Sequence, residues 1–132
     1  MSGVRPLIAV VDDEACVSKA LQRLLRAAGF RVEPFASGRA FLDWLRRDRP
    51  DCVVLDLHLP QLDGFEVQAR LAQKKGRGVP AIVITGCGSP QARQRALAGG
   101  AAAYLTKPLD RQALLEAIAV AIAPDPQASP PR

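Results

Sequence analysis

The sequence has no long hydrophobic run and no recognisable secretion signal. Its 132 residues contain no stretch of about 18 or more apolar residues, the length that a membrane-spanning helix needs. The apolar run Leu7–Val11 is too short for the core of a signal peptide and is followed directly by two acids, Asp12 and Asp13. These absences lead us to expect a cytoplasmic protein that does not bind membranes.

Cysteine and histidine are also scarce, with three cysteines and one histidine in the chain. Cys16, Cys52 and Cys87 form neither a CxxC pair nor a zinc-binding pattern, so we interpret them as free thiols or small buried apolar residues. No histidine or cysteine base is predicted at a strand end beside a nucleophile, which argues against a catalytic triad.

Nucleic-acid-binding motifs are missing, although the net charge of +5 makes such a partner worth considering. The basic residues gather at the ends of predicted helices, where the carbonyl dipoles favour cations. No helix-turn-helix, zinc finger or aromatic-rich RNA-binding motif is visible. We therefore expect no direct contact between this domain and nucleic acid.

What the sequence does contain is a regular alternation of strand and helix. Three continuous apolar runs, Leu7–Val11, Cys52–Leu55 and Ala81–Ile84, are typical of strands buried on both faces of a sheet. Arg31–Phe35 alternates polar and apolar residues as an edge strand does, and Ala102–Leu105 predicts a short last strand. Helices are predicted between and after the strands, at Glu14–Ala28, after the N-cap Ser37, and at Gly64–Gln73, Pro90–Ala98 and Asp110–Ala123.

This order of elements predicts one α/β domain over residues 1–123. Five strands alternating with five helices indicate a doubly wound parallel sheet with helices on both faces. The flavodoxin-like strand order 2-1-3-4-5 puts the first and third strands side by side. Residues 124–132 hold four prolines in nine positions and predict a proline-rich linker or disordered tail.

Acidic residues follow the two strands that this order makes neighbours. Asp12 and Asp13 come after the first strand, and Asp56 ends the third. Ligand sites in doubly wound sheets lie at the carboxyl ends of the strands, so we expect these carboxylates to converge. Three carboxylates at one place oppose one another's ionisation unless a cation is present, and Mg²⁺ is the natural candidate because it prefers oxygen ligands.

A hydroxyl and an ammonium are predicted at the same edge, from Thr85 at the end of the fourth strand and Lys107 after the fifth. Together with the acids they suit phosphoryl transfer to a carboxylate, because cations neutralise the phosphoryl oxygens while Asp56 attacks in line. Taken singly, the acids could be helix caps and Thr85 an ordinary strand-end residue.

These residues, in this order, resemble the response-regulator receiver family over residues 6 to 122. The matching positions are Asp12-Asp13, Asp56 with the loop Leu57–Gly64, Thr85, Tyr104 and Lys107-Pro108. The segments Ile84–Gly88 and Tyr104–Leu109 resemble the FixJ branch of that family in particular. The resemblance implies a (βα)5 receiver fold and a role in two-component signalling, with Asp56 phosphorylated by a sensor histidine kinase.

The resemblance also implies roles for individual residues. Mg²⁺ would be held by Asp13, Asp56 and the backbone carbonyl of His58, with Asp12 acting through water. A cis peptide bond between Lys107 and its following proline would aim the lysine at the phosphate. The domain would be a phosphoacceptor signalling module that assists its own phosphorylation and dephosphorylation, rather than an enzyme.

For output, the resemblance implies that Thr85 and Tyr104 act as a switch. It would alter the surface made by the last two predicted helices and the strand between them, and that surface would serve homodimerisation or docking of an effector. Members of the FixJ branch usually carry a C-terminal DNA-binding domain, absent from these residues, so we expect a role in transcription regulation. His58 and Cys87 lie two residues after Asp56 and Thr85, and we expect them to tune the lifetime of the phosphoryl group.

Two other functions are compatible with parts of this pattern. A degenerate receiver would act as a phosphate-independent protein-interaction module, but the complete set of functional residues argues against it. A phosphohydrolase of the haloacid-dehalogenase type also uses a strand-end aspartate, but it needs a second acid two residues later, where this sequence has His58.

Overall fold

The structure, a computed structural model, describes residues 5–72 and 78–123. Strand and helix alternate throughout. The elements are β1 (Leu7–Val11), α1 (Ala15–Ala27), β2 (Arg31–Phe35), α2 (Gly38–Trp44), β3 (Cys52–Asp56), α3 (Gly64–Ala72), β4 (Ala81–Thr85), α4 (Pro90–Ala98), β5 (Ala103–Thr106) and α5 (Arg111–Ile122). Over these described ranges, no helix combines the length and the apolar character that crossing a membrane requires.

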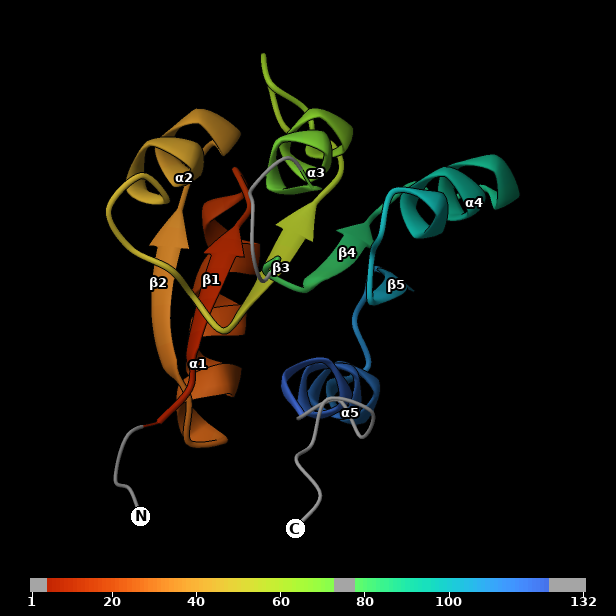
Figure 1. The fold of residues 1–132 in the computed structure, drawn as a ribbon. Helices are drawn as coiled ribbons and strands as arrows, with labels where there is room; N and C mark the ends of the chain where they lie inside the picture. The colour runs from red at the N-terminus through yellow and green to blue at the C-terminus, as the bar shows by residue number, and fades with distance from the viewer. Residues whose placement is uncertain (1–4, 73–77, 124–132) are drawn as a thin grey trace, which may run out of the picture.

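The strands form one parallel sheet in the order β2-β1-β3-β4-β5, which can be followed from left to right in Figure 1. β1 lies between β2 and β3, with Ile8 opposite both Val32 and Cys52. β4 lies between β3 and β5. This arrangement confirms the predicted doubly wound fold and its strand order, and it brings the carboxyl ends of β1, β3 and β4 to one edge of the sheet.

Helices cover both faces of the sheet (Figure 1). α1 and α5 pack on one face, against alternate strand residues such as Val10 and Val54. α2 and α3 pack on the other face, against residues such as Val11 and Leu55. Successive strand residues point to opposite faces, so a sheet covered on both sides requires the continuous apolar runs that the sequence shows.

β3 and β4 end at Asp56 and Thr85, as predicted, whereas β5 is shifted by one residue from the predicted strand and ends at Thr106. Pairing explains these ends, because Asp56 lies opposite Ile84 and Thr85 lies opposite Thr106 in the parallel ladder. Polar side chains therefore belong to the strands themselves, which fixes their backbones by inter-strand hydrogen bonds.

The helix ends differ in a similar way. Glu14, Ala28, Asp110 and Ala123 are caps rather than helical residues. Cap residues are only half inside a helix, and apolar periodicity does not show where the backbone leaves the helical conformation. Gln73 and residues 124–132 lie outside the described residues, so the end of the third helix and the proline-rich tail stay predictions.

Candidate functional site

Asp56 lies at the carboxyl edge of the sheet as the last residue of β3. The residue is buried, with a relative exposure of 2%. Oδ1 accepts a hydrogen bond of 3.1 Å from the backbone N–H of His58, in a tight turn just after the strand. Oδ2 accepts a hydrogen bond of 3.4 Å from Lys107 Nζ. The carboxylate is thus held from two sides in a defined orientation.

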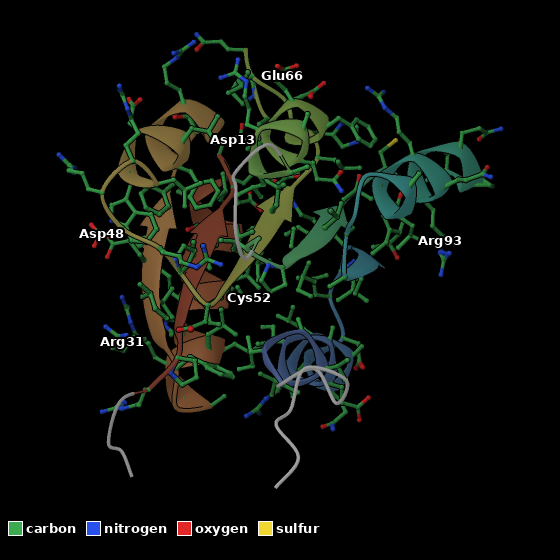
Figure 2. All side chains as sticks on the ribbon, viewed as in Figure 1. Asp13, Arg31, Asp48, Cys52, Glu66 and Arg93 are labelled. Carbon is green, nitrogen blue, oxygen red and sulfur yellow. The ribbon has the colours of Figure 1, made fainter. Side chains whose placement is uncertain are left out.

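Two further acids follow the neighbouring strand β1. Asp12 is buried and its Oδ1 accepts a hydrogen bond of 2.9 Å from the backbone N–H of Glu14. Asp13 is exposed; Figure 2 shows it at the arrowhead end of β1, whereas Cys52 lies at the opposite end of β3. Carboxylate oxygens of Asp12, Asp13 and Asp56 all lie within 4.8 Å of one another. The structure therefore brings together the three predicted carboxylates.

One cation contacts three acids at this edge. Lys107 Nζ lies 2.9 Å from Glu14 Oε1 in a hydrogen bond. It lies 3.2 Å from Asp12 Oδ2 and 3.4 Å from Asp56 Oδ2. Asp12 Oδ2 is buried and makes no hydrogen bond within the described part of the chain, so its contact with the lysine is an ion pair only. The Lys107–Pro108 peptide bond is cis, as the resemblance implied.

Burial and crowding change the proton affinities of this cluster. The pKa of Asp12 is raised by burial and by the charge of Asp56, against the hydrogen bond from the Glu14 N–H and the charge of Lys107. Burial lowers the pKa of Lys107, but its hydrogen bond to Glu14 and the charges of Asp12 and Asp56 outweigh burial, so that pKa is raised overall. The lysine stays an ammonium at neutral pH, and the acids still outnumber it.

The donor set fits a hard divalent cation. The converging ligand atoms are all carboxylate oxygens. The buried Asp12 Oδ2 has no hydrogen-bond donor among the described residues, which leaves it able to accept one from a metal-bound water. Mg²⁺ prefers oxygen ligands and keeps several waters when it binds to proteins. The residues present are therefore compatible with Mg²⁺.

Thr85 and Tyr104 lie on either side of the loop after β4. Thr85 is fully buried, and its Oγ1 accepts a hydrogen bond of 3.1 Å from the backbone N–H of Cys87. A Cβ added at Gly88 would lie 3.0 Å from the Tyr104 hydroxyl and 3.6 Å from Thr85 Cγ2. The Tyr104 hydroxyl is itself buried without a hydrogen bond to any described residue. The two predicted switch residues therefore meet at Gly88.

His58 and Cys87 are both exposed. The backbone N–H of His58 donates a hydrogen bond to the side chain of Asp56, and the backbone N–H of Cys87 donates one to the side chain of Thr85, two residues earlier in each case. This places both at the rim, where their predicted tuning roles stay predictions. All three cysteines are free thiols. Cys52 is buried, and burial raises the pKa of its thiol to about 12, so it acts as a small apolar residue.

Reasoning from the sequence missed two residues of this site. Glu14 contacts Lys107, and a signal was present because glutamate is a poor N-cap residue directly after an acidic pair. Gly88 allows the tyrosine hydroxyl to approach the loop, and it has no positive φ that would otherwise require glycine.

The fold and the site together define the class of the protein. A five-stranded parallel sheet of this order, with an acid cluster at the ends of β1 and β3 and a lysine after β5, is the receiver class of doubly wound domains. Residues 8–119 match the family model of the response regulator receiver domain. The chain belongs to the response regulator receiver family, whose members are signalling domains of two-component systems.

Individual relatives agree with this assignment. The chain is 35% identical over 134 residues to response regulator protein TodT of Pseudomonas putida, which covers 100% of this chain and 59% of TodT. It is 43% identical over 108 residues to response regulator MprA of Mycolicibacterium vanbaalenii, covering 82% of this chain and 46% of MprA. The chain thus spans about half to three fifths of these curated relatives.

Solved structures show the same fold. A response regulator receiver protein from Burkholderia phymatum shares 41% identity with a TM-score of 0.79, over 89% of this chain and 95% of that one. The structure of FixJ-N shares 34% identity with a TM-score of 0.82, over 90% of this chain and 94% of that one. The resemblance to the FixJ branch is therefore supported in both sequence and fold.

Proposed function

We propose that this chain is a cytoplasmic, phosphorylatable receiver in which Asp56 takes a phosphoryl group from the phosphohistidine of a sensor histidine kinase. The observation that carries the proposal is a buried strand-end carboxylate within hydrogen-bond distance of an ammonium and beside two further acids. A carboxylate that only capped a helix would not need an ammonium and two further acids beside it. A phosphoryl acceptor needs both charge compensation and orientation.

The transfer is a substitution at phosphorus. An oxygen of ionised Asp56 forms the new O–P bond while the bond from phosphorus to the donor breaks. With acetyl phosphate the electron pair leaves on acetate; with a phosphohistidine protonated at its other ring nitrogen, the leaving group is neutral imidazole. Lys107, 3.4 Å from Asp56 Oδ2, would neutralise the phosphoryl oxygens as they arrive.

Mg²⁺ belongs to the same proposal. Asp13, Asp56 and the backbone carbonyl of His58 would hold it, and Asp12 would act through a water. When bound, the ion supplies positive charge to the acids and to the phosphoryl oxygens. The chain's own contribution is to keep the three carboxylates converged, with Asp12 held by the Glu14 N–H and Asp56 by the His58 N–H.

The output of phosphorylation would be a change in α4, β5 and α5. A phosphoryl oxygen on Asp56 offers the Thr85 hydroxyl a new acceptor on the adjacent strand. If Thr85 moves inward, Tyr104 gains room to turn away from Gly88, where its hydroxyl has no hydrogen bond among the described residues. Only contacts that differ between two states can shift their populations, and these two residues supply such contacts. The changed surface would pair with a second copy or with an effector domain.

His58 and Cys87 would set the lifetime of the phosphoryl group. Both are exposed at the rim and can shield the phosphorus or position an attacking water. Replacing both with alanine should change the dephosphorylation rate while leaving the melting temperature nearly unchanged. Equal rates in the two proteins would exclude this role.

The test is intact-mass spectrometry after incubation with acetyl phosphate and Mg²⁺. Wild type and a control, Asp43→Asn on the exposed side of α2, should each gain one phosphoryl group. Asp56→Asn should gain none, and chelation of Mg²⁺ should prevent labelling of wild type. Equal labelling of the Asp56→Asn protein would contradict the assignment, and unlabelled wild type would favour a phosphate-independent interaction module.

A further inference from the structure

Glu14 occupies the N-cap position of α1 without capping the helix. Its backbone is extended, with φ −87° and ψ 111°, but its side chain makes no capping hydrogen bond. Glutamate is not among the residue types that N-caps favour. The side chain reaches instead to the loop after β5, where Oε1 accepts a hydrogen bond of 2.9 Å from Lys107 Nζ. This is the shortest of the three contacts of that ammonium with acids.

Acids surround the lysine in this arrangement. Nζ donates hydrogen bonds to Glu14 and Asp56 and forms an ion pair with Asp12, whose Oδ2 lies 3.2 Å away. Phosphoryl oxygens that arrive at Asp56 therefore compete with these carboxylates for the ammonium.

The three partners differ in how easily they can be released. The side chains of Asp12 and Asp56 are 0% and 3% exposed, so neither can turn into water. The Glu14 side chain is 60% exposed, and water solvates it as soon as it lets go. Glu14 is thus the partner that the lysine can exchange at the smallest cost.

From this geometry we infer that Glu14 is a positioning residue that holds Lys107 in the unphosphorylated state and competes with the phosphoryl oxygens for it. The inference rests on the proposed function of Asp56 and adds to it a control on the rate of phosphorylation. Removing the charge of Glu14 frees the ammonium to meet the incoming phosphoryl group. Glu14 therefore slows phosphorylation through Lys107, without contacting Asp56 itself.

The first experiment compares initial rates of phosphorylation at several acetyl phosphate concentrations and saturating Mg²⁺. Glu14→Gln should react about two- to fivefold faster than wild type, the range expected for one solvent-screened ion pair. Glu33→Gln removes the same charge from an exposed position in the edge strand β2 and should react as wild type does. Equal rates for the Glu14→Gln and Glu33→Gln proteins would overturn the inference.

A second pair of variants separates positioning from simple repulsion of the anionic donor. Glu14→Asp keeps the charge but shortens the reach, so a positioning role predicts a rate close to that of Glu14→Gln, whereas repulsion predicts the wild-type rate. In a Lys107→Met background, Glu14→Gln should have no effect on the rate, because the lysine through which Glu14 acts is absent. A persisting acceleration in that background would overturn the role of the lysine.

A readout without phosphate keeps this inference distinct from the proposed function. In the unphosphorylated protein, the side-chain NMR signal of the Lys107 ammonium should shift in Glu14→Gln and stay in place in Glu33→Gln. An unchanged signal in both proteins would disprove the contact. If the signal shifts but wild type takes up no phosphoryl group, the contact holds, and the proposed function and the rate control fail together.

Discussion

Two regions of this domain are built very differently. The acceptor region consists of β1 and β3 with the acids at their carboxyl ends, and every residue of β3 is buried. The α4–β5 region has no buried residue in β5 and one buried residue, Ala96, in α4. The proposed phosphoryl transfer thus takes place at the ends of strands that are buried except for Leu7, whereas the surface proposed to change is made of elements with almost no buried residues. Regions with few buried contacts shift at low cost in free energy.

The contacts that hold α4 in place are few and specific. Gln68 of α3 donates a hydrogen bond of 2.8 Å from Nε2 to the Ala96 carbonyl. The Arg95 guanidinium lies 3.9 Å from the centroid of the Phe65 ring. On the sheet side, Ala96 packs with Leu57 and Val83 in a small cluster that Tyr104 borders. A helix with so few contacts can move when the loop before it changes.

The largest difference between the regions should appear in core substitutions. Leu55 of β3 is fully buried, and Leu55→Ala should lower the free energy of unfolding by about 2–5 kcal/mol. Leu105 of β5 is half-buried, and Leu105→Ala should cost about 1 kcal/mol. Urea denaturation followed by circular dichroism measures both. Equal losses in the free energy of unfolding would contradict the difference in packing between the two regions.

Removal of the Thr85 hydroxyl, which is proposed to couple the two regions, should have the next largest effect. Thr85→Ala should leave Asp56 able to accept a phosphoryl group but abolish the response of α4 and β5, a coupling of about 1–3 kcal/mol. Wild type is the reference. Sedimentation with and without beryllofluoride should show self-association that depends on the mimic for wild type only. Association that survives in Thr85→Ala would place the link elsewhere.

The acceptor region should be strained by its own charge when Mg²⁺ is absent. The pKa of Asp12 is raised above 3.8, chiefly by burial and then by the charge of Asp56. The folded state therefore binds this proton more tightly than the unfolded state, and its contribution to stability is lost as pH rises from about 3.8 through the folded pKa. At pH 7 without Mg²⁺, Asp12→Asn should stabilise the fold modestly, because burial and the charge of Asp56 disfavour the ionised form of Asp12 more than the Glu14 N–H and Lys107 favour it.

The advantage of Asp12→Asn should disappear below pH 3.8, where Asp12 is protonated in both states of wild type. Added Mg²⁺ should reverse it, because the variant has lost an oxygen that helps to hold the ion. Thermal melts across pH, with and without Mg²⁺, measure these changes. A variant less stable than wild type at pH 7 without Mg²⁺ would show that Lys107 already compensates the acids fully.

The smallest effect is expected at Tyr104. Its hydroxyl is buried without a hydrogen bond to a described residue, so it contributes no bond that Tyr104→Phe could break. The substitution should be neutral or stabilising by up to about 1 kcal/mol in the unphosphorylated protein. Urea denaturation decides, and a loss of more than 1 kcal/mol would reveal a hydroxyl partner in solution.

The sequence was sufficient for the architecture and for the convergence of the acids. Leu7–Val11 and Cys52–Leu55 are apolar throughout because both faces of the sheet are covered, and parallel strands send the acids that follow them to the same edge. The strand order, and the proposal that Asp56 is the phosphoryl acceptor, followed from these two facts together with the family resemblance.

What the sequence could not show are contacts between side chains distant in the chain. Glu14 and Lys107 are 93 residues apart, and no local pattern pairs them. The approach of the Tyr104 hydroxyl to Gly88 depends on the pairing of β4 with β5, which apolar periodicity places only to within a residue. Ala28 and Ala123 lie at helix ends, where apolar side chains give no signal for the last helical residue.

The most direct measurement is the amide NMR spectrum of the wild-type protein with and without beryllofluoride in the presence of Mg²⁺. Our account predicts large shifts in the loop 86–89, α4 and β5, and small ones in β1 and β3 away from the acids. Asp56→Asn should show none of them. Shifts confined to the immediate surroundings of Asp56, with α4 and β5 unchanged in the wild-type protein, would contradict the account.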